Sequence, residues 1–181
     1  MTVRRTIRLP DWLERVDASV DRAWEPLRSD RTANAVFYAA SAAGDFSVIW
    51  HGINLARVAA GTADRREAAR LAIALGVESV LVNQVLKRLF ERERPIATAP
   101  RPHHLRAPST SSFPSGHASS GALAASLLAQ GSRLAPVYGT IAAVVATSRI
   151  HVRIHHASDI AAGAAVGLVM GAVVRRLVPR R

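Results

Sequence analysis

Apolar runs separated by short polar segments dominate the chain from residue 33 onward. The runs cover residues 33–43, 46–60, 67–86, 116–129, 134–147 and 160–174, and the last helix is expected to begin at about residue 156. A helix that crosses roughly 30 Å of hydrocarbon needs about 20 apolar residues, and the shorter runs approach that length once their flanking residues are added. The pattern therefore predicts an all-α, integral membrane helical bundle with about five spanning helices, in which 33–43 is a short interfacial or re-entrant helix.

A different pattern covers residues 1–32. Here charged side chains surround an apolar stripe at helical spacing, made of Trp12, Val16, Val20, Trp24 and Leu27. This spacing predicts an amphipathic helix with tryptophan on its apolar side. We interpret residues 1–32 as a segment that lies in the membrane interface, and residues 33–181 as the membrane-embedded domain. The alternative is a helix packed on a soluble core, which the small amount of polar chain elsewhere disfavours.

Composition narrows the function classes. The net charge is +11, but aromatic residues make up only 5% of the chain and no nucleic-acid-binding motif is present. Basic residues that flank apolar runs fit a membrane protein better than a nucleic-acid partner. The chain has no cysteine, which excludes disulfides and thiol chemistry. No stretch has the layout of a cleavable signal peptide.

Small and polar residues follow a helical period in two of the apolar runs. Gly163, Gly167 and Gly171 recur every fourth residue, which predicts a closely packed helix face. Asp159 and His155 continue this spacing toward the N-terminus. In the run 67–86, Ser79 and Asn83 form a polar stripe that leads to Lys87.

His155 and Asp159 stand out within a polar stretch, residues 148–159, that joins two apolar runs. On a helix, residues four apart share a face, so the carboxylate is expected to hold one imidazole nitrogen and leave the other free to act as a base or nucleophile. By itself the stretch is slightly better explained as an interfacial cluster that only anchors helix ends. Two further motifs decide between these interpretations.

The three motifs lie in a fixed order at the boundaries of the apolar runs. Lys87 is followed after six residues by Arg94-Pro95, residues 114–117 read Pro-Ser-Gly-His, and Ser148-Arg149 precedes His155 and Asp159. They resemble the signature of the type 2 phosphatidic acid phosphatase (PAP2) superfamily, which reads K-x6-RP, PSGH and SR-x5-H-x3-D. Every fixed position matches, and the resemblance covers roughly residues 44–171.

The resemblance implies a bundle of the PAP2/haloperoxidase-like type and a metal-independent lipid phosphatase that works through a phosphohistidine intermediate. Its catalytic residues would be His155 as nucleophile, Asp159 as its partner and His117 as the acid that protonates the leaving alkoxide. The phosphate-binding residues would be Lys87, Arg94, Ser115, Gly116 and Arg149. Three cations and the N–H groups at a helix start can stabilise the negative charge on the equatorial oxygens of a phosphoryl group during its transfer.

No metal or other cofactor is expected. The three cations already meet the charge of a phosphate, and no carboxylate cluster suggests a magnesium site. A zinc site at His151, His155 and His156 fails on spacing, because no convincing third ligand accompanies the first two. His156 is the rival nucleophile if the register slips, since Asp159 is three residues from it.

The expected substrate is a membrane lipid phosphate or diphosphate, because the site would open at the membrane interface. Phosphatidate, phosphatidylglycerol phosphate and polyprenyl phosphate or diphosphate all fit. The small Arg- and Ala-rich chain resembles bacterial, including actinobacterial, members, some of which are thought to act on decaprenyl-linked phosphoribose. The alternatives are a catalytically silent membrane interaction protein and a vanadate-dependent haloperoxidase-like enzyme. The expected location is the plasma membrane, with several crossings, and the lipid bilayer and the substrate are the expected partners.

The polar, proline-rich residues 96–113 form the longest predicted loop. Loops of this length are usually functional, and we interpret this one as a mouth or lid over the site.

Overall fold

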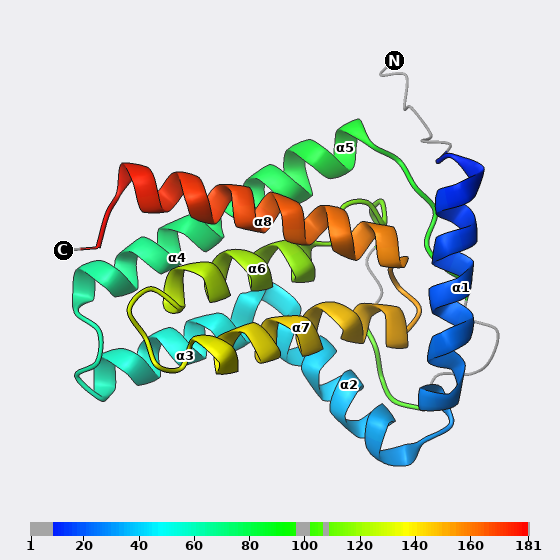
Figure 1. Ribbon diagram of the computed structural model, residues 1–181, viewed down its shortest axis with the longest axis horizontal. Coiled ribbons are helices and arrows are strands. Elements are labelled where there is room, and N and C mark those ends of the chain that lie inside the picture. Colours follow the sequence, from blue (N-terminus) through cyan, green and yellow to red (C-terminus); the bar gives the residue numbers. More distant parts are fainter. Residues whose placement is uncertain (1–8, 97–101, 107–108, 181) are drawn as a thin grey trace.

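The fold is all-helical in the computed structural model, which describes residues 9–96, 102–106 and 109–180 (Figure 1). The helical elements are α1 (Asp11–Arg28), α2 (Arg31–Gly44), η1 (Asp45–Ser47), α3 (Val48–Ala59), α4 (Arg65–Val80), η2 (Leu81–Leu86), α5 (Lys87–Leu89), α6 (Gly116–Leu128), α7 (Ala135–His151) and α8 (Ala157–Leu177). The predicted all-α bundle is confirmed. Of the predicted loop over the site, residues 97–101 and 107–108 lie outside the described residues.

Helix α6 is the centre of the bundle and packs against α8, α7 and α4 (Figure 1). The glycine stripe of α8 makes the closest of these contacts possible. A Cβ atom at Gly163 or Gly167 would overlap the carbonyl oxygens of Ser115 or Ser119 on α6. Gly171 likewise approaches Ser126 too closely to carry a side chain. The predicted packing face is therefore confirmed, and its partner is α6.

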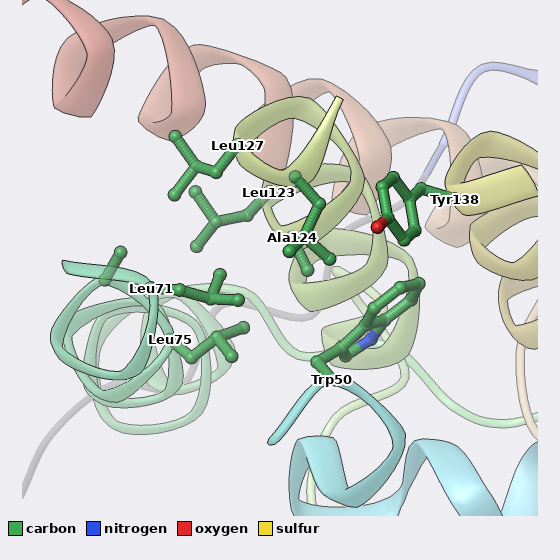
Figure 2. Packing of buried hydrophobic residues seen from close by; sticks show 9 residues of the cluster. Trp50, Leu71, Leu75, Leu123, Ala124, Leu127 and Tyr138 are labelled. Atoms are coloured by element: carbon green, nitrogen blue, oxygen red, sulfur yellow. The ribbon is translucent and has the colours of Figure 1, made fainter. Parts of the chain in front are cut away.

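The largest hydrophobic cluster lies where α3, α4, α6 and α7 meet. Figure 2 shows Trp50 and Tyr138 facing Ala124, with Leu71 and Leu75 opposite Leu123. Trp50 and Leu123 are fully buried. Between helices in a bilayer, van der Waals contact between closely packed side chains replaces removal from water as the source of stability, and this cluster supplies such contact among the four helices.

Large apolar side chains also face outward. On α8 these are Leu168, Val169 and Val173, and on α4 they are Ile73, Val77 and Val80. Among the described residues, two helical stretches are long and apolar enough to cross a membrane, Arg65–Leu89 and Ala157–Leu177. Outward apolar faces of this kind suit hydrocarbon better than water. The total of about five spanning helices stays a prediction.

The break predicted at Gly44-Asp45 is confirmed. Helix α2 ends at Gly44, and Phe46 and Ser47 then adopt positive φ angles of 52° and 59° before α3 begins. Gly44 is required by a close approach, because a Cβ there would overlap the ring of His117. The break thus brings the end of α2 against the first turn of α6.

Helix α1 crosses the end of the bundle beside α7 and α8 (Figure 1). The predicted helix forms, but its buried side chain is Asp17, while Trp12 and Val16 of the apolar stripe are exposed. Arg28 ties the helix to the end of α7 by donating to the carbonyl of Ile150 at 2.9 Å. Helix α1 therefore contacts the bundle through polar groups and through Trp24, whose ring centroid lies 5.9 Å from that of Phe37 on α2. The position of residues 1–32 in a membrane interface stays a prediction.

Candidate active site

The Pro-Ser-Gly-His motif forms the start of α6. Ser115 is the N-cap residue, and its backbone N–H donates to the carbonyl of Asp159 at 3.0 Å. A Cβ at Gly116 would lie 3.9 Å from Nζ of Lys87, so the lysine and the helix start are neighbours. The N-terminus of a helix presents unpaired N–H groups to an anion. The first two motifs thus meet at one point, as the sequence predicted.

A widened turn precedes Lys87. Residues Leu81–Leu86 form a π-helix between α4 and α5, and such turns are frequent at functional sites. Lys87 is buried, and its ammonium donates to Oδ1 of Asn83 at 3.0 Å, while Asn83 donates to Ser79 at 3.3 Å. The predicted polar stripe is confirmed and leads to the lysine.

Arg149 lies deep in the bundle, with 1% of its surface exposed. Its Nη1 donates to Oγ of Ser41, and its Nε has no hydrogen-bond partner within the described structure. Arg149 and Arg94 lie close enough to Lys87 for their positive charges to repel its ammonium. A buried guanidinium with an unpaired N–H is costly to maintain, so this cluster is suited to receiving an anion.

Arg94 belongs to the same cluster but its guanidinium is already committed. Three backbone carbonyls accept its N–H groups, those of Thr110 at 3.1 Å, Ser111 at 3.0 Å and Ile154 at 3.0 Å. Burial lowers the pKa of the Arg94 guanidinium, and the nearby Asp159 opposes that shift. Arg94 therefore adds positive charge to the site and also holds the backbone just before His155.

His155 is not on a helix, and the premise that it shares a helix face with Asp159 is wrong. Helix α7 ends at His151 and α8 begins at Ala157, so His155 lies in the connection between them. Asp159 helps to cap the start of α8, because its Oδ2 accepts from the backbone N–H of His156 at 2.9 Å.

The predicted contact between His155 and Asp159 nevertheless forms. Nδ1 of His155 lies 3.5 Å from Oδ2 of Asp159, and both side chains are almost fully buried. At 3.5 Å the two atoms are too far apart for a well-formed hydrogen bond, but the carboxylate still faces the imidazole and favours this ring orientation. Burial lowers the pKa of His155 to about 3, so the ring is neutral at neutral pH. A neutral imidazole keeps the lone pair that a nucleophile needs.

His117 has a carboxylate partner that the sequence interpretation missed. Its Nε2 lies 3.0 Å from the carbonyl oxygen of Ser41 and 3.4 Å from Oδ1 of Asp45. Burial favours a raised pKa for the Asp45 carboxyl, but His117, Arg149 and Arg106 outweigh it and the pKa is lowered. The available signal was the Gly44-Asp45 pair, which we interpreted only as a helix break.

Arg92 is a second missed residue. Its Nη1 lies 2.6 Å from Oδ1 of Asp159. It occupies one of the variable positions between Lys87 and Arg94, so the motif itself gave no reason to select it. The site therefore contains two histidine–carboxylate pairs and a group of cations between them.

Comparison with known sequences agrees with this geometry. The sequence model of the PAP2 superfamily matches residues 67–181. The chain belongs to the PAP2 superfamily. The predicted family membership is thus confirmed, and the matched region contains all three motifs.

Individual PAP2 proteins are similar to this chain to different extents. Decaprenylphosphoryl-5-phosphoribose phosphatase of Mycobacterium tuberculosis is 39% identical over 90 residues, which are 50% of each chain. The chain thus spans about half the length of these curated relatives. A transmembrane PAP2-type phosphatidylglycerolphosphate phosphatase from Bacillus subtilis matches 93% of this chain and 87% of its own, with a TM-score of 0.73 and 24% identity. Aquifex aeolicus LpxE matches 97% and 99%, with a TM-score of 0.71 and 21% identity. The two structures share the fold.

The remaining histidines near this PAP2 site are held by other contacts. His151 stacks on Phe37 with ring centroids 4.6 Å apart, and its Nε2 lies 3.0 Å from Oδ1 of Asn34. Nε2 of His156 lies 3.3 Å from the carbonyl oxygen of Glu93. In the part of the chain that the structure describes, no three His, Asp or Glu side chains form a group that could hold a metal ion.

A cavity of ≈ 440 Å³ opens beside His155. Helix α1 forms one wall with Asp17, and Arg92 and Ile96 contribute to another. From this side, His155 is therefore reached between α1 and the end of the first motif, residues 92–96.

Proposed function

We propose that this PAP2 protein is a metal-independent phosphatase that hydrolyses a phosphomonoester or diphosphate of a membrane lipid. The observation that carries the proposal is the position of His155, a buried neutral imidazole beside Asp159 and within the field of Arg94 and Arg149. A nucleophile next to an anion-binding cluster is what phosphoryl transfer requires.

In the first step, the lone pair of Nε2 of His155 attacks phosphorus while Asp159 faces Nδ1–H. A nitrogen–phosphorus bond forms, and the bond between phosphorus and the lipid oxygen breaks. His117 donates a proton to that oxygen, so the lipid leaves as an alcohol. In the second step, His117 accepts a proton from water, the resulting hydroxide attacks phosphorus, and the nitrogen–phosphorus bond breaks. Phosphate is released and both histidines return to their starting states.

The cations stabilise charge on the equatorial phosphate oxygens in both steps. Arg149 and Lys87 supply N–H donors to the phosphate, and the start of α6 supplies the hydroxyl of Ser115 and the backbone N–H of Gly116. The contribution of Arg94 is its charge and its hold on the carbonyl of Ile154, since its N–H groups already have acceptors.

The substrate is a lipid whose phosphate reaches the membrane interface. The Mycobacterium tuberculosis relative is named for decaprenylphosphoryl-5-phosphoribose, so a polyprenyl-linked sugar phosphate is the first candidate. Phosphatidate, phosphatidylglycerol phosphate and polyprenyl phosphates or diphosphates are the others. Phosphate release from this panel by the purified protein in detergent ranks them.

The protein is proposed to cross the plasma membrane several times through residues 33–181, with residues 1–32 in the interface. The 13 residues of α6 and the 17 of α7 fall short of the roughly 20 needed to cross hydrocarbon, so they would rely on flanking residues. Resistance to extraction by carbonate or high salt tests membrane insertion, and release without detergent contradicts it.

The decisive experiment is a single turnover with a labelled lipid phosphate. We expect a phosphoenzyme that is labile in acid and stable in base, as a phosphohistidine is, and its absence from His155→Gln. An intact protein that releases no phosphate from any lipid in the panel would instead support a catalytically silent interaction protein.

A further inference from the structure

A chain of short ionic contacts connects α1 to the partner of the nucleophile. Asp17 Oδ2 lies 2.7 Å from Nη2 of Arg92, and Nη1 of Arg92 lies 2.6 Å from Oδ1 of Asp159. The side chains are 4%, 10% and 0% exposed, respectively. Ion pairs so far removed from water are sensitive to the loss of one partner, because the remaining charge is left uncompensated.

Asp17 also holds the first turn of α8. Its Oδ1 accepts from the backbone N–H of Ser158 at 2.8 Å, and its Oδ2 accepts from the hydroxyl of Ser158 at 2.6 Å. The same hydroxyl accepts from Nη1 of Arg92 at 2.8 Å. A residue of α1 thus binds an N–H group at the start of α8 in the way a capping residue does.

These contacts determine which oxygen of Asp159 faces the nucleophile. Arg92 occupies Oδ1, whereas Oδ2 accepts from the N–H of His156 and faces Nδ1 of His155. With both oxygens bound, the carboxylate cannot rotate without breaking at least one short contact. The orientation of His155 therefore depends on Arg92, and that of Arg92 depends on Asp17.

We infer that Asp17 is a positioning residue for the nucleophile, acting through Arg92 and Asp159. The inference rests on the proposed function. Asp17 precedes residues 67–181, so the N-terminal helix contributes to the site from outside the region matched by the family model. The competing explanation is that Asp17 only fastens α1 to the bundle.

Asp17→Asn tests the inference, because the amide keeps the shape and removes the charge that holds Arg92. We expect kcat for lipid phosphate hydrolysis to fall on the order of 10- to 100-fold, the usual cost of misplacing a reacting group, with KM unchanged. The matched control is Glu25→Gln on the same helix. Glu25 pairs with Arg153 and Arg28, and Arg28 fastens α1 to the end of α7. An equal fall in kcat for both variants would support the fastening explanation and overturn the inference.

A double-mutant cycle tests the route through Arg92. If Asp17 acts only through Arg92, Asp17→Asn should cost nothing further in an Arg92→Gln background. Losses that multiply would contradict the proposed route. If Arg92→Gln fails to fold, Arg92→Lys is the milder variant. An ammonium keeps the positive charge, but it cannot bond Asp17 and Asp159 at the same time as the guanidinium does.

A measurement that needs no turnover separates this inference from the proposed function. Ring ¹⁵N shifts of His155 can be recorded by NMR in detergent micelles and assigned with His155→Gln. We expect Asp17→Asn to change these shifts and Glu25→Gln to leave them as in the unmodified chain. Unchanged shifts in Asp17→Asn would overturn the inference, whether or not the protein hydrolyses lipids. Absence of phosphate release together with changed shifts would instead count against the proposed function alone.

Discussion

The two histidine–carboxylate pairs of the site differ in how they are enclosed. The side chains of His155 and Asp159 are 2% and 0% exposed, whereas those of His117 and Asp45 are 13% and 22% exposed. Arg92 and the N–H of His156 fix Asp159, while Asp45 lies in a break between helices, beside two residues with positive φ.

The difference matches the two roles that we propose. A nucleophile must be neutral and held in one orientation, and burial among fixed partners provides both conditions. A general acid must lose and regain a proton in each turnover, so contact with solvent and a carboxylate close to its ring are useful to it. Changes on the two sides of the site should therefore have different signatures.

The largest effect is expected at the buried pair. His155→Gln should lower kcat on the order of 10⁴-fold or more, as removal of a covalent nucleophile does in other enzymes, and should abolish the phosphoenzyme. Single-turnover labelling with a lipid phosphate measures both. Retention of a normal rate would exclude His155 as the nucleophile.

At the more open pair, His117→Gln should slow the hydrolysis of an alkyl phosphate about 10²- to 10⁴-fold. A nitrophenyl phosphate, whose leaving group needs no protonation, should restore phosphoenzyme formation in this variant but not in His155→Gln. Burst kinetics with the two substrates measure the contrast. Equal losses with both leaving groups would show that His117 is not the acid.

The positive charge of Arg149 acts on both histidines of the site. Arg149→Lys should lower kcat/KM roughly 10²-fold for either leaving group, because an ammonium cannot replace a planar fork that binds two phosphate oxygens. Orthovanadate should inhibit the unmodified protein and bind this variant more weakly. Equal vanadate inhibition of both proteins would argue against a phosphate contact at Arg149.

Asp45→Asn should have a smaller effect, about 10-fold or less on kcat, because an amide oxygen can still face Nε2 of His117. The loss should be confined to alkyl phosphates, as expected if Asp45 acts through the leaving-group acid. The leaving-group comparison made for His117→Gln measures this. A loss that is the same with nitrophenyl phosphate would place Asp45 in phosphate binding instead.

The last prediction concerns stability and pH rather than rate. The pKa of His155 falls from 6.5 to about 3 because of burial, so the folded chain binds fewer protons here than the unfolded chain does. The corresponding stability is complete above pH 6.5 and is lost as the pH falls toward 3. His155→Gln should flatten the fall in melting temperature between pH 6.5 and 4.5, measured in detergent. Because the pKa of Asp45 is lowered from 3.8, its effect on stability is confined to pH values below 3.8. Asp45→Asn should therefore leave the fall in melting temperature between pH 6.5 and 4.5 unchanged.

Features that depend on local spacing could be predicted from the sequence. The break at Gly44-Asp45, the α8 glycine stripe, the polar stripe to Lys87 and the three motifs all depend on residues a few positions apart. Helix formation and side-chain periodicity act over that range. The helices α6 and α7 were also predicted, from the short runs 116–129 and 134–147. Helix α7 extends further than its run, to His151, and so carries Arg149 inside the bundle.

Other features were decided only by the way the helices pack. The sequence places Asp45 far from His117, and Asp17 far from Arg92 and Asp159, so no local pattern relates them. It also suggested a helix through His155, but the capping contact of Asp159 with His156 starts α8 later and leaves His155 in the connection. Contacts between distant segments depend on which helix faces close against each other, and burial then selects the polar partners that each enclosed charge requires. The sequence by itself thus selected the residues to which we assign the chemistry, and the tertiary structure decided which residues hold them in place.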